Sequence, residues 1–300
     1  MQARAERVAD RLAPRELGAL VISGSANLRW LTGFTGSSGL AIVGPGNGRH
    51  FFTDFRYDEQ SAAQLGDAWD RHIVTDLHRA AGELLHELQS GRPLRVGFDD
   101  RDVSVKTHGT LTEAAGSGVE LVAAGGIIED LRTVKDDAEI AAIGAAAALA
   151  DAALLTILDR GLAGRTEREV ATDLEIEMRR AGAQAASFPT IVASGAHGAL
   201  PHAEPRDVEI PSGVLVTIDW GAELDGYCSD CTRTFATGEI GETEREVYEL
   251  VLAAAEAALA AARVDDSRRS GVRQSAIRER RADAVARDFR RGGDVDGRTA

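Results

Sequence analysis

The sequence is poor in several residue types that often define a protein's class. It has 2 cysteines, Cys228 and Cys231, so no disulfide framework holds the fold. Lysine occurs only as Lys106 and Lys135, so arginine supplies almost all of the positive charge. The formal net charge of -14 argues against nucleic acid as a partner, because phosphate binding needs a basic surface.

Long hydrophobic runs are scarce as well. The longest apolar stretch, around Ile143 to Ile157, is rich in alanine and is predicted to be too short to span a bilayer. The N-terminal residues MQARAERVADRL are amphipathic and charged, without the apolar core of a signal peptide. We therefore expect no membrane partner and a cytoplasmic location. The 300 residues, 44% of them hydrophobic and 27% charged, are typical of a soluble globular protein.

The first part of the chain alternates short apolar runs with amphipathic stretches. Strands are predicted at residues 19–24, 39–45, 49–55, 72–76, 95–100 and 119–125, each bounded by turn-forming residues. Helical periodicity fits residues 2–13, 57–65, 77–89 and 104–115. Such alternation predicts a three-layer α/β domain with a mixed or parallel sheet.

The pattern changes near IIEDLRTVKDDAEI, where we place a domain boundary at residue 128. Capping-box pairs Asp136 with Glu139, Thr166 with Glu169 and Thr243 with Glu246 predict helices at about 137–160, 167–181 and 244–262. A β-rich block, residues 187–238, lies between the second and third helices. The second domain therefore reads as α+β, with long helices covering an antiparallel sheet.

The segment TIDWGAELDGYCSDCTRTF, residues 217–235, predicts a hairpin that contains two aspartates. If Asp225-Gly226 forms a two-residue turn, residue 219 pairs with 232, and Asp230 is a diagonal neighbour of Asp219 on the same face. Two carboxylates that converge between apolar residues favour a bound divalent metal. The alternative is that either aspartate simply ends a strand at the surface.

Two further motifs admit more than one interpretation. Cys228 and Cys231 form a C-x-x-C pair, which a zinc or redox site could use, but its place inside a strand favours a packing role. The segment FPTIVASGAHGALPHAEP predicts a strand at 188–194 and then an ordered loop with His197 and His202. A histidine aimed by its flanking prolines could stabilise an oxyanion or move a proton, or it could be an ordinary surface histidine.

Together these segments resemble the metallopeptidases with the pita-bread fold, in the branch of the Xaa-Pro aminopeptidases and prolidases. SGAHGALPHAEP is similar to the histidine loop of that branch, and TIDWGAELDGYCSDCTRTFATG to its hairpin with the first two metal ligands. NLRWLTGFTGSSGLAIV, FFTDFRYDEQ and IIEDLRTVKDDAEI resemble the creatinase-type N-terminal domain and its junction. The resemblance covers about residues 1–262.

The resemblance implies an α/β N-terminal domain, residues 1–128, followed by an incomplete α+β pita-bread domain, residues 129–262. It implies hydrolysis of the bond preceding proline in proline-containing peptides, with two divalent metal ions such as Mn²⁺, Co²⁺ or Zn²⁺. Asp219 and Asp230 match two of the family's five metal ligands, and Asp230 would bridge the ions. His202 matches the histidine that contacts the substrate and steadies the tetrahedral intermediate. A homodimer is a further expectation, since relatives of this kind are often dimers.

The other three ligands that the resemblance implies, one histidine and two glutamates, are not assigned. No histidine follows His202, and Glu279 is the only glutamate after residue 256. Residues 267–300 have ten arginines and five acidic residues, which makes residues 263–300 an atypical basic tail. A solvated extension, a nucleic-acid-binding tail, and a truncated or frameshifted reading of a GC-rich gene are the alternatives for it.

These observations leave three functional hypotheses. The first is an Xaa-Pro peptidase by descent, inactive or nearly so as this polypeptide. The second is a non-catalytic pita-bread protein that binds a peptide or a partner. The third is a creatinase-like, metal-free hydrolase, against which the pair Asp219 and Asp230 argues. An incomplete second domain is also expected to expose apolar surface and to be poorly soluble or sensitive to proteolysis.

Overall fold

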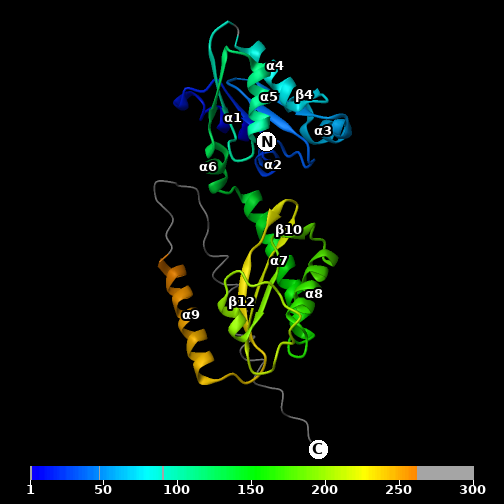
Figure 1. The fold of residues 1–300 in the computed structure, drawn as a ribbon, viewed down its shortest axis with the longest axis vertical. Helices are drawn as coiled ribbons and strands as arrows, with labels where there is room; N and C mark the ends of the chain where they lie inside the picture. The colour runs from blue at the N-terminus through cyan, green and yellow to red at the C-terminus, as the bar shows by residue number, and fades with distance from the viewer. Residues whose placement is uncertain (1, 47, 90, 262–300) are drawn as a thin grey trace, which may run out of the picture. The chain divides into compact units, whose positions relative to one another are not determined.

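The computed structural model describes residues 2–46, 48–89 and 91–261 (Figure 1). The chain divides between Lys135 and Asp136 into two compact units. Each unit has a hydrophobic core of its own and is described separately below.

The first unit contains a mixed six-stranded sheet in the order β4-β3-β2-β1-β5-β6. Its strands are β1 (Ala19–Ile22), β2 (Leu40–Val43), β3 (Arg49–Thr53), β4 (Asp70–Ile73), β5 (Leu94–Phe98) and β6 (Val119–Ala123). Strand β2 pairs antiparallel with β1 and β3, whereas the pairs β3–β4, β1–β5 and β5–β6 are parallel. Every residue of β1 and β2 is buried, as expected for strands covered on both faces.

Helices cover both faces of this sheet. They are α1 (Gln2–Ala9), α2 (Ser25–Thr32), α3 (Asp58–Leu65), α4 (Leu77–Leu88), α5 (Val105–Ala115) and α6 (Ile127–Thr133). Leu20 and Ile22 of β1 pack into a core with residues of α1, α2 and α6, whereas Ala19 and Val21 pack into a second core with residues of α4 and α5. The predicted three-layer α/β domain is confirmed.

Two helices of this unit were not predicted from the sequence, and the domain boundary and the start of one strand were predicted at other positions. Helices α2 and α6, of 8 and 7 residues, were not predicted because a two-turn helix gives little periodic signal. The boundary predicted at residue 128 falls inside α6, whose Ile127, Ile128 and Leu131 are buried in the first unit's core. Strand β4 begins at Asp70, two residues before the predicted start, because its register follows parallel pairing with β3.

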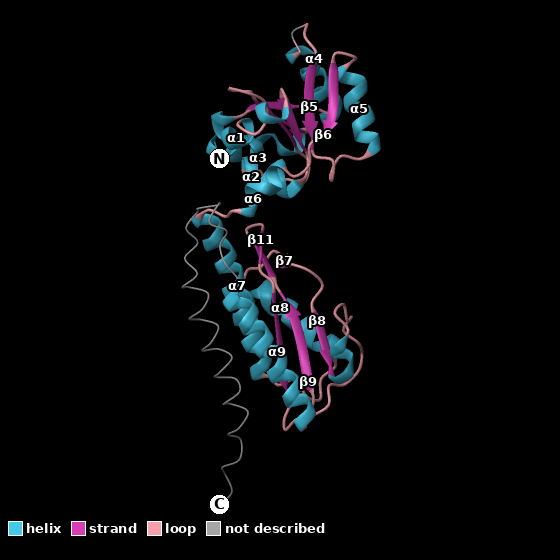
Figure 2. Cartoon of the chain, turned by 90° about the vertical axis from the view of Figure 1, so that its left-hand side faces the viewer, coloured by secondary structure: helices cyan, strands magenta, loops and turns pink. Residues whose placement is uncertain are grey.

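The described part of the second unit contains three helices and two small antiparallel sheets. Its helices are α7 (Asp137–Asp159), α8 (Glu167–Arg180) and α9 (Glu242–Ala261). Its strands are β7 (Ala185–Ala186), β8 (Ile191–Ser194), β9 (Leu215–Trp220), β10 (Ala222–Leu224), β11 (Tyr227–Cys228) and β12 (Cys231–Ala236), in the orders β11-β10-β7 and β12-β9-β8. Residues of α7 and α8 form one core with the strands beside them (Figure 2).

Local capping explains two of the three helix starts. Asp136 and Thr166 accept hydrogen bonds from the backbone N–H groups of Glu139 and Glu169, and both predicted capping boxes are present. The third prediction, a helix that starts at 244 with Thr243 as its cap, is wrong by two residues, since α9 already begins at Glu242. Helix α9 buries none of its described residues, and it exposes the apolar side chains of Val247, Leu250, Val251 and Leu259.

The longest apolar stretch, predicted to be too short to span a bilayer, lies within helix α7. It is a continuous 23-residue helix with a mean hydropathy of 2.0 over its most apolar window, so length and composition alone would let it cross a membrane. Its Ala150, Ala153, Leu154 and Ile157 nevertheless pack into the core of the second unit. The apolar character of this helix is therefore used, at least in part, for packing.

Candidate functional site

Asp219 lies on β9, the central strand of a three-stranded antiparallel sheet. It pairs with Thr232 of β12 on one side and with Ile191 of β8 on the other. Its neighbours Ile218 and Trp220 point to the opposite face, where both are buried in the core with α7 and α8. The Trp220 indole N–H donates a hydrogen bond of 3.0 Å to the Ala150 carbonyl of α7, which fixes the strand against that helix. Asp219 is thereby held on the face away from the core.

The hairpin after β9 closes in the predicted way. Leu224 pairs with Tyr227, so Asp225 and Gly226 form a two-residue turn, and their φ angles are 49° and 71°. Two successive residues with positive φ are the mark of the type I′ turn, whose twist matches antiparallel strands. The Gly226 N–H also donates to the side-chain oxygen of Gln184 at 3.0 Å. The predicted turn and the predicted pairing of residue 219 with 232 are both confirmed.

The same register places Gly221 opposite Asp230. The pairs Asp219–Thr232 and Glu223–Cys228 have the same offset, and the positions between them continue it. A Cβ atom on Gly221 would overlap the Ser229 carbonyl oxygen. The Ser229 hydroxyl accepts a hydrogen bond from the Ala222 N–H at 2.9 Å. Glycine is therefore needed here for close approach of the two strands, and no side chain from position 221 fills the space beside the two aspartates.

The two aspartates differ in their surroundings. The Oδ1 atom of Asp219 is buried and has no hydrogen-bond partner among the described residues. Asp230, immediately before β12, is exposed. A buried carboxylate oxygen without a partner is costly unless something binds it, so Asp219 fits the requirement for a metal ligand. Asp219 and Asp230 together supply two carboxylates, a ligand type that hard and borderline divalent ions bind.

A buried carboxylate, Glu167 of α8, organises the histidine loop. Its Oε1 accepts hydrogen bonds of 2.8 Å from both the backbone N–H and the hydroxyl of Ser194, at the end of β8. Its Oε2 accepts from the Arg206 backbone N–H at 3.2 Å, and the Arg206 guanidinium donates to both oxygens at 3.0 Å. His197 Nδ1 lies 3.0 Å from Oε2. One carboxylate thus holds the two ends of the segment 194–206.

The ionisation of Glu167 follows from these contacts. Burial by itself would raise its pKa, but the hydrogen bonds from the Arg206 side chain and from Ser194 outweigh that effect and lower the pKa to about 2. The side chain is fully buried, and it is an anion at neutral pH. No sequence pattern indicates this role, because Glu167 looks like an ordinary acidic residue in the first turn of a helix.

The two histidines of the loop have different environments. His197, in the 3-10 helix Gly195–Ala199, is turned toward Glu167, and its side chain is 9% exposed. His202 is exposed and makes no hydrogen bond or ion pair with another described residue. The structure therefore assigns His197 a part in holding the loop. It leaves the His202 side chain available for an external group.

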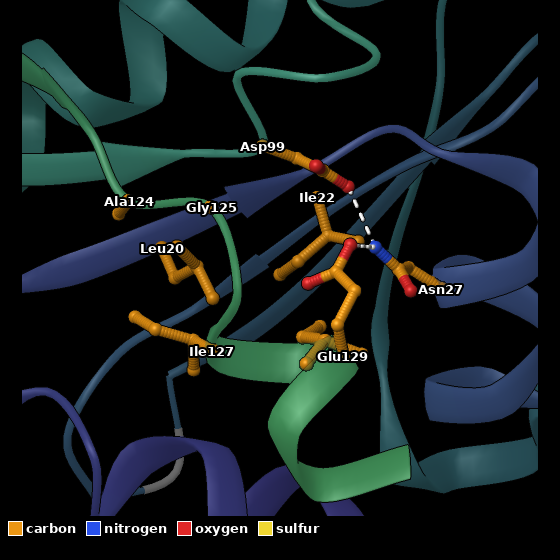
Figure 3. Close-up of a pocket in the computed structure, with 9 residues that line it drawn as sticks. Leu20, Ile22, Asn27, Asp99, Ala124, Gly125, Ile127 and Glu129 are labelled. Carbon is orange, nitrogen blue, oxygen red and sulfur yellow. Dashed lines mark hydrogen bonds between the residues drawn. The ribbon is translucent and has the colours of Figure 1, made fainter. Parts of the chain in front are cut away.

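Polar groups also converge at a small cavity in the first unit (Figure 3). The Asn27 amide nitrogen donates to Asp99 Oδ2 at 2.8 Å and to Glu129 Oε1 at 2.9 Å. Arg132 donates to the Asn27 side-chain oxygen at 2.7 Å. The cavity volume of about 10 Å³ admits roughly one water molecule. Burial raises the pKa of Asp99. The cavity is too small for a substrate, and its hydrogen bonds join α2, the end of β5 and α6.

Both cysteines have free thiols. Cys228 is exposed, and Cys231 is half-buried and packs against the core of the second unit. No disulfide joins them.

Comparison with known proteins identifies the family. Residues 141–292 match metallopeptidase family M24, and residues 4–134 match the creatinase/prolidase N-terminal domain. The chain belongs to metallopeptidase family M24. The resemblance found in the sequence is confirmed, and by family the chain is a hydrolase. The M24 match runs to residue 292, past residue 262, the predicted end of the resemblance.

Several M24 relatives are peptidases named for proline substrates. The uncharacterized peptidase YqhT of Bacillus subtilis is 37% identical over 247 residues, which cover 82% of this chain and 68% of YqhT. An Xaa-Pro dipeptidase of Pyrococcus furiosus is 43% identical over 137 residues, which cover 46% of this chain and 39% of that protein. Among solved structures, an Xaa-Pro dipeptidase from Bacillus anthracis superposes with a TM-score of 0.78 and 33% sequence identity. The superposition covers 84% of this chain and 69% of that one.

These comparisons confirm the fold class of this M24 chain, a creatinase-type α/β domain followed by a pita-bread domain. The aligned part spans from 39% to 69% of the three proteins' own lengths. M24 is a family of metallopeptidases, whose members use divalent metal ions. The assignment of Asp219 and Asp230 as metal ligands stays a prediction.

Proposed function

We propose that the chain is by descent an Xaa-Pro peptidase of the aminopeptidase P or prolidase type, a class of enzymes that hydrolyse the peptide bond preceding proline. The single observation that carries the proposal is Asp219 Oδ1, a buried carboxylate oxygen without a partner among the described residues, on the central strand beside Gly221 and Asp230. The relatives named Xaa-Pro dipeptidases support the substrate class.

In this proposal Asp219 and Asp230 hold divalent metal, with Mn²⁺, Co²⁺ and Zn²⁺ as candidates. When bound, the metal would supply Lewis-acid chemistry at the scissile carbonyl group. The strand pairing fixes the backbone of Asp219, and Gly221 leaves room on the same face. His202, exposed on a loop that Glu167 braces, would donate a hydrogen bond to the peptide carbonyl oxygen as charge develops on it.

The described residues supply only part of the ligand set that the resemblance implies. Among residues 2–46, 48–89 and 91–261, no third His, Cys, Asp or Glu completes a cluster with Asp219 and Asp230. We therefore expect the 300-residue polypeptide by itself to be inactive or nearly so. This observation also favours the second candidate, a non-catalytic member of the family that binds a proline-containing peptide or a partner.

The test is hydrolysis of Ala-Pro and Ala-Pro-Ala by the purified chain with added Mn²⁺ or Co²⁺, beside the Asp219→Ala variant. Turnover that the substitution abolishes supports the peptidase and shows that further ligands come from outside the described residues or from a second subunit. No turnover and no tight Mn²⁺ binding by the folded chain supports the non-catalytic candidate. Turnover that Asp219→Ala leaves unchanged contradicts the proposed site. A homodimer and a cytoplasmic location remain parts of the proposal.

A further inference from the structure

A second group of potential metal ligands lies in the first unit, on the two parallel strands β3 and β4. His50 of β3 pairs in register with Asp70 of β4, and His72 is two residues further along β4. Strand β4 is an edge strand of the six-stranded sheet (Figure 1). Because alternate residues of a strand share a face, all three side chains project from the same side.

Three donor atoms of this group form a nearly regular triangle. His50 Nδ1 lies 3.2 Å from His72 Nε2 and 3.2 Å from Asp70 Oδ2, and His72 Nε2 lies 3.5 Å from the same oxygen. Tetrahedral zinc has ligands at about 2.0–2.1 Å, which places neighbouring donor atoms roughly 3.3–3.4 Å apart. The observed triangle therefore has the size of one face of a tetrahedral zinc site.

Hydrogen bonding alone does not satisfy this triangle when both histidines are neutral. If one of the two facing nitrogens has a proton, the lone pair of the other faces the Asp70 carboxylate oxygen. If both have protons, the two N–H groups face each other across 3.2 Å. A divalent cation would instead accept a lone pair from all three atoms at once.

The surroundings hold this geometry while leaving it open to solvent. The His72 ring stacks on Phe52, with ring centroids 4.5 Å apart and an angle of 13° between the planes. The side chains of His50 and His72 are 17% and 28% exposed, whereas Asp70 is 65% exposed. An ion can therefore reach the site from the Asp70 side, where the fourth coordination position would also lie.

We propose that His50, Asp70 and His72 form a binding site for one zinc-class divalent ion, separate from the Asp219 and Asp230 pair. Two imidazole nitrogens and one carboxylate oxygen select Zn²⁺ over Mg²⁺ and Ca²⁺, which prefer oxygen ligands alone. The ion would fasten the edge strand β4 to β3 and take water as its fourth ligand. No other group of three such residues lies this close together in the described part of the chain.

The experiment measures Zn²⁺ bound per chain by equilibrium dialysis of the full-length protein. An Asp219→Asn/Asp230→Asn background removes the ligands of the other proposed site. In this background we expect one Zn²⁺ per chain, and we expect the affinity to fall at least tenfold with Asp70→Asn and the ion to be lost with His50→Gln/His72→Gln. His78→Gln, a half-buried histidine of the same unit outside the cluster, is the matched control and should retain the ion.

Absence of bound Zn²⁺ in the background protein would overturn the proposal, and so would retention of Zn²⁺ at undiminished affinity in both cluster variants. Asp70→Asn changes a largely exposed side chain, so its result stands even if the double histidine variant folds poorly. Visible absorption of bound Co²⁺ adds a second readout, since tetrahedral coordination that includes imidazole should disappear with His72→Gln. Loss of Zn²⁺ with His78→Gln would count against the assignment to these three residues.

Discussion

The guanidinium group of Arg206 donates to both carboxylate oxygens of Glu167, each at 3.0 Å, and Glu167 is fully buried. This contact joins the first turn of α8 to the end of the loop that contains His202. Because Ser194 and His197 bind the same carboxylate, the loop is closed around one anion at both ends.

Replacing Glu167 by Gln should destabilise the second unit by about 3 kcal/mol or more, since it leaves buried donors facing a neutral amide. The measurement is chemical denaturation followed by tryptophan fluorescence, to which the buried Trp220 of this unit contributes. Asp207→Asn is the matched control, because it breaks an exposed ion pair with Arg168 between the same helix and loop. A loss for Glu167→Gln no larger than that of the control would contradict the assigned role.

The same carboxylate should make the loop sensitive to acid. The pKa of Glu167 is lowered from 4.5 to about 2, so its stabilising effect is complete above pH 4.5 and is lost as the pH falls toward 2. The protection of residues 194–206 against amide hydrogen exchange, measured relative to the intrinsic exchange rate at each pH, should fall steeply over this interval. In Glu167→Gln the protection of this segment should be low already at neutral pH and should change little with acidification. An unchanged acid response in the variant would assign the effect to other carboxylates.

Gly221→Ala should destabilise the hairpin by about 1–3 kcal/mol, because its Cβ would overlap the Ser229 carbonyl oxygen and push the two strands apart. The same substitution at Gly144, inside α7 where a Cβ meets nothing within 4 Å, should instead stabilise the protein by about 1 kcal/mol. Thermal unfolding of both variants measures the difference. Equal effects at the two positions would show that close strand approach at Gly221 is unimportant.

Asp219→Asn should raise the stability of the metal-free protein by about 1 kcal/mol, since it removes a charge whose Oδ1 is buried without a partner among the described residues. Asp230→Asn, at an exposed position, should leave the metal-free stability unchanged. Any increase in unfolding temperature that Mn²⁺ causes in the parent protein should vanish in both variants. Destabilisation of the metal-free protein by Asp219→Asn would mean that the carboxylate has a structural partner instead.

Local features of the sequence determined much of this protein. Asp225-Gly226 set the turn, and with it the register that pairs Asp219 with Thr232, because a two-residue turn allows only one alignment of its strands. Asp136 and Thr166 fixed the starts of α7 and α8 through bonds that span three residues. The alternation of strands and helices was enough to predict a three-layer first unit.

Only the tertiary structure decided which distant residues meet. Glu167 contacts Ser194 and Arg206, which are 27 and 39 residues away in the sequence. The hydrophobic periodicity of the sequence does not predict such a contact. The His50, Asp70 and His72 triangle depends on the register between β3 and β4, which is set by packing. The apolar run in the sequence predicted the start of β4 two residues too late. Hydrogen bonds within a turn or a helix cap join residues close in the sequence, so they can be predicted from it. The contacts between distant side chains depend on how strands and helices pack.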